Sequence, residues 1–292
     1  MIYGVLAYLL WGLFPAFFPL LEPAGAVEIL AHRIIWAAAL MALVLGVTRG
    51  WGELRGAGRT TWLRMGAAGL LIAANWLIYI VAVNSGHVAD AALGYFINPL
   101  VSVLLGVFIL GERLRRLQLI AVLLAGVAVL WLTFVGGQPP VLALGLALTF
   151  GFYGLLKKQI PVSGAAGLAA ETLVLAPLAL GYLGWLEATG RGTALSNGPG
   201  HLALLVLSGV ITVIPLLLFA RATKVITLST IGMLQYLTPT MQMLWALFVV
   251  NEHVSPQRWV GFVLIWVAVA VFLTDATRTR RAATPRRGPS AG

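Results

Sequence analysis

Long apolar runs separated by short polar segments are the dominant pattern along this chain. Each run has about the 20 residues that an α-helix needs to cross roughly 30 Å of hydrocarbon. The runs are too long and too continuously apolar for the ten-residue alternation of membrane β-strands. We therefore predict transmembrane helices at residues 2–21, 27–47, 65–84, 90–110, 117–135, 141–158, 166–186, 201–220, 228–250 and 258–275.

One segment of the pattern occurs twice, about 140 residues apart. Pro99 stands thirteen residues before Glu112, and Pro239 stands thirteen residues before Glu252, with an apolar run between them in both cases. Five helices per half is an odd number, so the second half must enter the membrane in the opposite orientation. The predicted fold is an all-α polytopic membrane protein with ten transmembrane helices in two inverted five-helix repeats. The repeats cover residues 1–137 and 138–277, and a basic, disordered tail follows at 278–292.

The distribution of charge supports a membrane protein and predicts its orientation. Hydrophobic residues make up 60% of the chain, charged residues make up 10%, and the mean hydropathy is +0.97. Sixteen of the nineteen Lys and Arg residues fall on one side if both termini are cytoplasmic, against Arg191 and Arg258 on the other, with Arg33 inside a helix. We expect a multi-pass protein of the cell inner (plasma) membrane with both termini in the cytoplasm. The net charge of +10 then reflects basic loops that face anionic lipid, and it gives no reason to expect nucleic acid.

Several motifs along the chain resemble one transporter family. These are AYLLWGLFP (Ala7 to Pro15), EILAHRIIW (Glu28 to Trp36), NWLIYIVAVN (Asn75 to Asn84), GYFINP (Gly94 to Pro99), Gly111-Glu112-Arg113 and LQYLTP (Leu234 to Pro239). They are similar to the RarD branch of the EamA-type transporters, in the drug/metabolite transporter superfamily. The resemblance implies a ten-helix permease of a bacterial inner membrane, with helices one to four of each half around a central cavity and helices five and ten at the periphery. Asn251-Glu252-His253 departs from the Gly-Glu pair that is usual in the second repeat.

Neutral polar residues near the two repeated prolines are the candidate substrate site. A proline frees the carbonyl four residues before it, here those of Tyr95 and Gln235, near the middle of the membrane. Polar groups at that depth are expensive to present to lipid, so they point to a cavity between the repeats. The alternative is that they are packing kinks satisfied by neighbouring helices, and the aromatic members in particular could simply pack. The candidate cavity residues are Trp11, Asn75, Tyr79, Tyr95, Asn98, Pro99, Tyr153, Gln235, Tyr236 and Pro239.

The ionisable residues inside the spans are candidates for gating or proton coupling. Glu28 and His32 share one face of the second helix, and Arg33 lies about 100° round it. This cluster is either an outer gate, a proton site or a contact for a substrate carboxylate, or else an ion pair that fixes the helix. Glu171 has no charged partner nearby in sequence and is expected near a helix N-terminus, where the helix dipole stabilises a carboxylate.

The chain lacks the parts of an enzyme active site. It has no cysteine, its four histidines are scattered, and neither a nucleophile elbow nor a P-loop is present. We therefore expect no enzyme activity, no cofactor and no metal. Two halves that rock about a central site favour a secondary transporter that works by alternating access, and a passive channel or facilitator for small neutral solutes is the alternative.

The predicted cavity also limits the substrate. Amides, phenols and freed carbonyls with few fixed charges suit small organic solutes such as amino acids, other metabolites or drugs, and they argue against multiply charged anions. The expected partners are a small-molecule substrate and membrane lipid, while proton coupling and a homodimer stay open.

Overall fold

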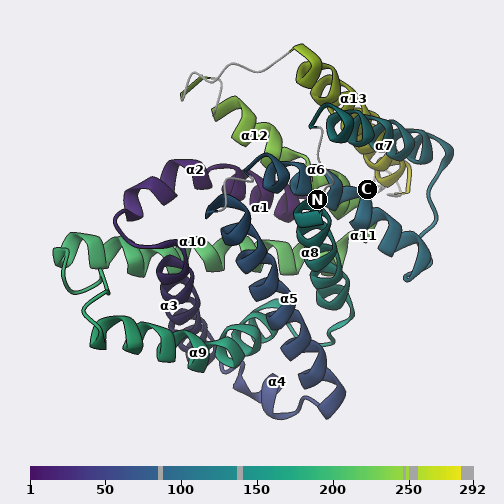
Figure 1. Cartoon of the computed structure of the whole chain (residues 1–292). Coiled ribbons are helices and arrows are strands. Elements are labelled where there is room, and N and C mark those ends of the chain that lie inside the picture. The colour runs from purple at the N-terminus through teal and green to yellow at the C-terminus, as the bar shows by residue number, and fades with distance from the viewer. Residues whose placement is uncertain (85–87, 137–140, 246–247, 250–255, 284–292) are drawn as a thin grey trace, which may run out of the picture.

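The computed structural model describes residues 1–84, 88–136, 141–245, 248–249 and 256–283, and every regular element among them is a helix (Figure 1). The helices are α1 (Ile2–Gly12), α2 (Phe14–Phe17), the 3-10 helix η1 (Phe18–Leu21), α3 (Ala26–Val47), α4 (Trp51–Arg55), α5 (Arg59–Asn84), α6 (Val88–Phe108), α7 (Arg116–Gly136), α8 (Val141–Gln159), α9 (Gly164–Ala188), α10 (Gly198–Val225), α11 (Leu228–Gln235), α12 (Leu237–Trp245) and α13 (Pro256–Ala283).

Much of the surface of these helices is apolar, as contact with a lipid bilayer requires. Within the described residues, seven helices are long and apolar enough to cross a membrane, and Gly94–Phe108 and Trp259–Asp275 form shorter apolar helices. Large apolar side chains cover the outside, among them Leu123, Phe134 and Leu178, which are 62%, 80% and 73% exposed. The chain is a polytopic, all-helical membrane protein.

Prolines explain where the helices depart from the predicted spans. The first span is divided into α1, α2 and η1, because Pro15 and Pro19 each occupy the first turn of a new helical segment. The predicted span 228–250 is likewise broken between α11 and α12 at Tyr236, next to the carbonyl that Pro239 frees. In contrast, α6 continues through Pro99.

The end of the chain differs from the sequence prediction. Helix α13 continues to Ala283, so residues 278–283 are helical and the disorder predicted for 278–292 is wrong for that part. Residues 284–292 lie outside the described part of the chain.

Helices from distant parts of the sequence pack together. Helix α3 contacts both α9 and α10, α6 contacts α8 and α11, and α1 contacts α10 and α12. Helices α7 and α13 lie side by side at one edge of the molecule (Figure 1) and share an apolar cluster with α6 and α11. Segments before residue 137 and after residue 140 are therefore interleaved, and neither half encloses the interior alone.

Charged groups gather where α8 and α10 end, which we call the basic end. Lys158 Nζ donates to the carbonyl of Ile226 at 2.7 Å, and Lys224 Nζ donates to the carbonyl of Ile160. A lysine near the C-terminus of each helix thus binds a carbonyl just beyond the C-terminus of the other. Glu112 accepts from the backbone N–H groups of Leu228 (2.6 Å) and Ser229 (2.9 Å) and thereby caps α11. These contacts tie α6, α8, α10 and α11 together at this end.

Glycines permit the close helix crossings. A Cβ on Gly209 of α10 would meet Trp36 and the backbone of Ala37 in α3 at less than van der Waals distance. A Cβ on Gly12 would similarly meet Met241, and one on Gly94 would press on Leu146. Small residues therefore set the separation of these helices, as is common in membrane bundles.

Gly209→Leu tests the crossing of α3 and α10. We expect it to lower the stability by about 1–3 kcal/mol or more, because the helices would have to separate. The control is Gly181→Leu, since nothing lies within 4 Å of a Cβ there. Thermal unfolding in detergent measures both variants, and an unfolding temperature for Gly209→Leu as high as that of Gly181→Leu would contradict the crossing.

Candidate functional site

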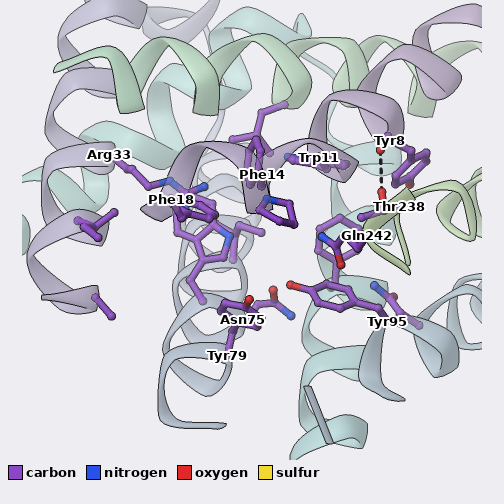
Figure 2. Close-up of a pocket in the computed structure, with 18 of the residues that line it drawn as sticks. Tyr8, Trp11, Phe14, Phe18, Arg33, Asn75, Tyr79, Tyr95, Thr238 and Gln242 are labelled. Atoms are coloured by element: carbon purple, nitrogen blue, oxygen red, sulfur yellow. Dashed lines mark hydrogen bonds between the residues drawn. The ribbon is translucent and has the colours of Figure 1, made fainter. Parts of the chain in front are cut away.

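A cavity of about 600 Å³ lies between the helices and is large enough for a small organic molecule (Figure 2). Its wall is built from helices of both halves of the chain, including α1, α3, α5, α6, α8, α10, α11 and α12. The side chains that give it its chemistry are Tyr8, Trp11, Phe14, Phe18, Arg33, Asn75, Trp76, Tyr79, Tyr95, Asn98, Phe150, Gln235, Thr238 and Gln242.

The cavity opens away from the basic end. Helix α1 starts there, with Gly4 next to Ile226, and the segment that follows crosses to Leu21, which packs against Ala194 and Leu205 at the opposite end. Glu22 and Ala26, just beyond Leu21, line the cavity. The mouth is thus at the end that carries the segment between η1 and α3.

Five aromatic side chains form a floor between the cavity and the basic end. Phe219 is fully buried at the centre, and its ring lies 5.8 Å from Trp11, 5.6 Å from Phe150 and 6.3 Å from Tyr8. Tyr153 stacks on Phe219 at 5.8 Å with an angle of 11° between the rings. We call Tyr8, Trp11, Phe150, Tyr153 and Phe219 the aromatic floor, and it closes the cavity on that side.

The polar wall of the cavity combines satisfied and unsatisfied groups. Asn75 Nδ2 donates to the carbonyl of Leu146 at 2.8 Å and to Thr149 Oγ1 at 2.9 Å, which fixes its orientation. Thr238 Oγ1 donates to the carbonyl of Tyr8 at 2.9 Å (Figure 2). Asn98 Oδ1 and Gln235 Oε1 are buried acceptors without a hydrogen-bond partner. Buried groups of this kind are rare unless a water or a ligand completes them.

The structure brings most of the predicted cavity residues together and places four elsewhere. Trp11, Asn75, Tyr79, Tyr95, Asn98 and Gln235 line the cavity. The other four do not line it. Tyr153 is in the aromatic floor, and Tyr236 packs 6.5 Å from Phe96 in the cluster of α7 and α13. Pro99 lies inside α6, and Pro239 lies in the first turn of α12.

The predicted cluster of Glu28, His32 and Arg33 is divided between two places. Glu28 accepts from the backbone N–H and the hydroxyl of Thr193 (2.7 and 3.0 Å). His32 Nδ1 accepts from the indole of Trp36 at 3.3 Å. Arg33 instead faces the cavity (Figure 2). The salt bridges among the described residues do not include these three, and the helix is held to its neighbours by the hydrogen bonds of Glu28 to Thr193 and of Arg33 to Thr212 instead.

Glu171 has a charged partner, Lys157, which lies on the preceding helix α8. Its Oε1 accepts from Lys157 Nζ at 2.8 Å, and its Oε2 accepts from the Tyr153 hydroxyl at 3.2 Å. The side chains of Lys157 and Glu171 are only 3% and 2% exposed. The sequence placed Lys157 with the surface charges, but it lies inside, directly behind the aromatic floor.

Of the aromatic lining of the first span, the sequence analysis predicted Trp11 and missed Tyr8, Phe14 and Phe18. Tyr8, Trp11, Phe14 and Phe18 recur every three or four positions, which is the spacing of one helix face, and this pattern could have indicated them. Trp76 and Phe150 carry no comparable signal, because an isolated aromatic residue in an apolar helix usually packs.

The chain has the fold and the central cavity of a polytopic membrane protein, and comparison with known proteins identifies its family. The EamA-like transporter family matches residues 1–134 and again residues 139–274. Protein RarD of Streptomyces exfoliatus is 47% identical over 98% of this chain and 91% of that protein, and the uncharacterized transporter YojE of Bacillus subtilis is 44% identical over 96% and 95%. This chain belongs to the EamA-like transporter family, in its RarD branch, and the resemblance seen in the sequence is confirmed.

A solved structure supports the fold. A protein of known crystal structure is 21% identical in sequence to this chain, and the two structures superpose with a TM-score of 0.72 over 95% of this chain and 98% of that chain. At that identity the likeness concerns the fold alone. The chain is thus a membrane transporter whose substrate the comparisons do not name.

The buried pair Lys157–Glu171 makes a testable prediction for stability. Removal of one partner leaves an uncompensated buried charge, so Glu171→Leu and Lys157→Met should each lower the stability by about 3–5 kcal/mol. The double variant Lys157→Met/Glu171→Leu should recover much of the loss. Thermal unfolding of the purified protein measures these effects.

The control is the more exposed pair Arg115–Asp275, whose side chains are 39% and 16% exposed. Arg115→Gln should cost only about 0–1 kcal/mol. If the double variant is as unstable as the sum of the two single variants, Lys157 and Glu171 do not act as a pair.

Proposed function

We propose that this protein is a secondary transporter that moves small organic solutes across the cell inner membrane by alternating access. The cavity of about 600 Å³, lined from both halves of the chain and closed on one side by the aromatic floor, is the observation that carries the proposal. Its size and its mixed aromatic and amide lining suit amino acids, other metabolites or drug-like molecules.

The proposed architecture is ten transmembrane helices in two inverted repeats, residues 1–137 and 138–277. The family's double match and the paired helix contacts support it. The contact of α3 with α10 has a counterpart in that of α9 with α5, and α6 meets α11 as α7 meets α13. Such paired contacts are what a pseudo-twofold axis between the halves generates.

The proposed orientation places the basic end and both termini in the cytoplasm. The positive-inside rule supports this, because Arg64, Lys158 and Lys224 all lie at the basic end. In this orientation the cavity is open to the outside and the aromatic floor is the inner closure.

A carrier is favoured over a passive channel by the closed floor. A channel needs a continuous path, whereas the rings around Phe219, the pair Lys157–Glu171 and the crossed lysines of α8 and α10 stand in succession below the cavity. Substrate can pass only if these contacts open, and a second closure must then form at the mouth.

Glu171 is the proposed proton-coupling residue. It lies directly behind the floor, and Lys157, Tyr153 and, across a small apolar gap, Arg33 are its polar neighbours. Rearrangement of the floor would change its contact with Lys157 and hence its affinity for a proton. Glu28 and His32, near the mouth, are the alternative coupling residues.

Counterflow in proteoliposomes of the purified protein tests the transport function. We expect saturable exchange of small organic solutes, and we expect Asn98→Ala to reduce it about tenfold or more, since an acceptor in the cavity is removed. The control is Asn197→Ala, an exposed asparagine in the loop before α10. Flux that does not saturate and ignores Asn98→Ala would favour the channel.

The same vesicles with and without a pH gradient test the coupling. Uptake that rises with the gradient in the wild type and loses this response in Glu171→Gln, while counterflow persists, is the expected result. An unchanged response in Glu171→Gln would remove Glu171 from the coupling mechanism.

Orientation can be tested directly because the chain has no cysteine. We expect Glu22→Cys at the mouth and Gln242→Cys in the cavity wall to react with a membrane-impermeant maleimide added to intact cells. Arg55→Cys, at the exposed last residue of α4, should react only after the cells are permeabilised. The reverse pattern would invert the proposed orientation.

A further inference from the structure

Among the side chains that the structure describes, Arg33 is a cation inside the cavity that forms no salt bridge. It extends from α3, is partly exposed, and lines the cavity together with Trp76 and Phe18 (Figure 2). Its Nε donates to Thr212 Oγ1 of α10 at 2.9 Å. The guanidinium carbon lies 4.7 Å from the centre of the Trp76 ring, 5.4 Å from Phe18 and 5.6 Å from Phe14.

The carboxylates of the described residues nearest to Arg33 in the fold are engaged elsewhere. Glu28 is bound to Thr193, and Glu171 is bound to Lys157 and Tyr153. Glu22 lines the same cavity but is exposed at the mouth, and the structure shows no ion pair between it and Arg33. The charge of Arg33 is therefore not neutralised by these carboxylates.

Burial of the Arg33 guanidinium among aromatic rings costs free energy unless an anion binds it. A guanidinium has five N–H donors, of which Thr212 takes one, and the faces of three aromatic rings recover only part of the lost hydration. The remaining donors form a planar fork that matches both oxygens of a carboxylate. The described side chains of the site supply no anion for these donors, so the anion has to enter through the mouth.

We propose that Arg33 binds the carboxylate of the transported molecule, and that the substrate class is small monocarboxylates with an apolar or aromatic body. This inference rests on the proposed transport function and names its substrate class. Phe14, Phe18 and Trp76 contact the body next to the carboxylate. A second negative charge has no partner, because Arg33 is the one cation in the described lining and Glu22 repels anions at the mouth.

An amide side chain on the opposite wall of the cavity narrows the substrate class further. Asn98 Oδ1 is buried without a hydrogen-bond partner, and a substrate N–H or ammonium group can donate to it. Carboxylates that also carry an N–H group, such as amino acids, satisfy both sides of the cavity. The sequence analysis expected a cavity with few fixed charges, and the described lining carries two charged residues, Arg33 and Glu22.

The competing explanation is that Arg33 only ties α3 to α10 through Thr212. Two variants separate these roles. Arg33→Gln removes the charge, and Thr212→Val removes the tie while the charge remains. Arg33→Lys keeps the charge but loses the planar fork.

The test compares each carboxylate with its own primary amide, which has the same shape without the negative charge. The probes are phenylacetate, hexanoate and leucine with phenylacetamide, hexanamide and leucinamide. Ligand-induced thermal stabilisation and counterflow are both measured in the wild type and the three variants. We expect the carboxylates to bind better than the amides, and Arg33→Gln to weaken carboxylate binding about tenfold or more while amide binding changes little.

Thr212→Val should keep the preference for carboxylates, and Arg33→Lys should keep part of it. The proposal is overturned if Arg33→Gln weakens acids and amides equally, if it keeps the preference, or if none of the carboxylates binds the wild type. Chloride that stabilises the wild type as well as the carboxylates do would also overturn it, since the site would then be a general anion site.

The two readouts separate this proposal from the transport function. Saturable counterflow of acids and amides alike leaves the carrier intact and removes the role of Arg33. Stabilisation by carboxylates that depends on Arg33, without flux of any probe, retains the binding site and argues against the carrier.

Discussion

Hydrocarbon offers no hydrogen bonds, so each polar group inside this bundle must find a partner within the protein or at a cavity. The structure meets this constraint in two ways. Lys157, Glu171 and Tyr153 satisfy one another behind the aromatic floor. Glu112 satisfies the N-terminus of α11 at the basic end. Several buried polar atoms of the described side chains have no hydrogen-bond partner. Asn98 Oδ1, Gln235 Oε1 and the Tyr8 hydroxyl belong to residues that line the cavity together with Arg33, whereas the Tyr236 hydroxyl and His32 Nε2 lie outside its lining.

The two ends of the bundle are held by different kinds of contact. At the basic end, lysine ammonium groups meet helix C-terminal carbonyls, an arrangement that the helix dipole favours. At the other end, Glu28 binds Thr193, whose hydroxyl lies 2.9 Å from His201 Nε2, and this fixes the loop after α9 against α3. Under alternating access the first set must break while the mouth closes. Each charge-assisted bond contributes about 1.5–3 kcal/mol at most, so exchange between the two states is within reach of a ligand's binding energy.

The sequence predicted the helices well because apolar runs and prolines act locally. It also predicted the amide side of the cavity, since Asn75, Asn98 and Gln235 are polar residues in runs that otherwise face lipid. It did not predict the pair Lys157–Glu171, because a basic residue near a helix end usually reaches the surface and no pattern shows that α9 covers it. Tyr236 was misplaced for a related reason. The helix breaks at that residue, so its direction does not follow from the spacing within α11 or α12.

Arg33 connects the cavity to the energetics of the proposed cycle. Closure of the mouth would remove water from the guanidinium, and this costs more in an empty cavity than in one where a carboxylate occupies the fork. A ligand shifts a conformational equilibrium only through a difference in its affinity for the two states, and the closed cavity provides that difference because the charge pair is stronger away from water. The loaded protein should therefore change state more readily than the empty one. A carrier with this property exchanges substrate across the membrane faster than it returns empty, because the bound carboxylate compensates the charge of Arg33 in the closed state.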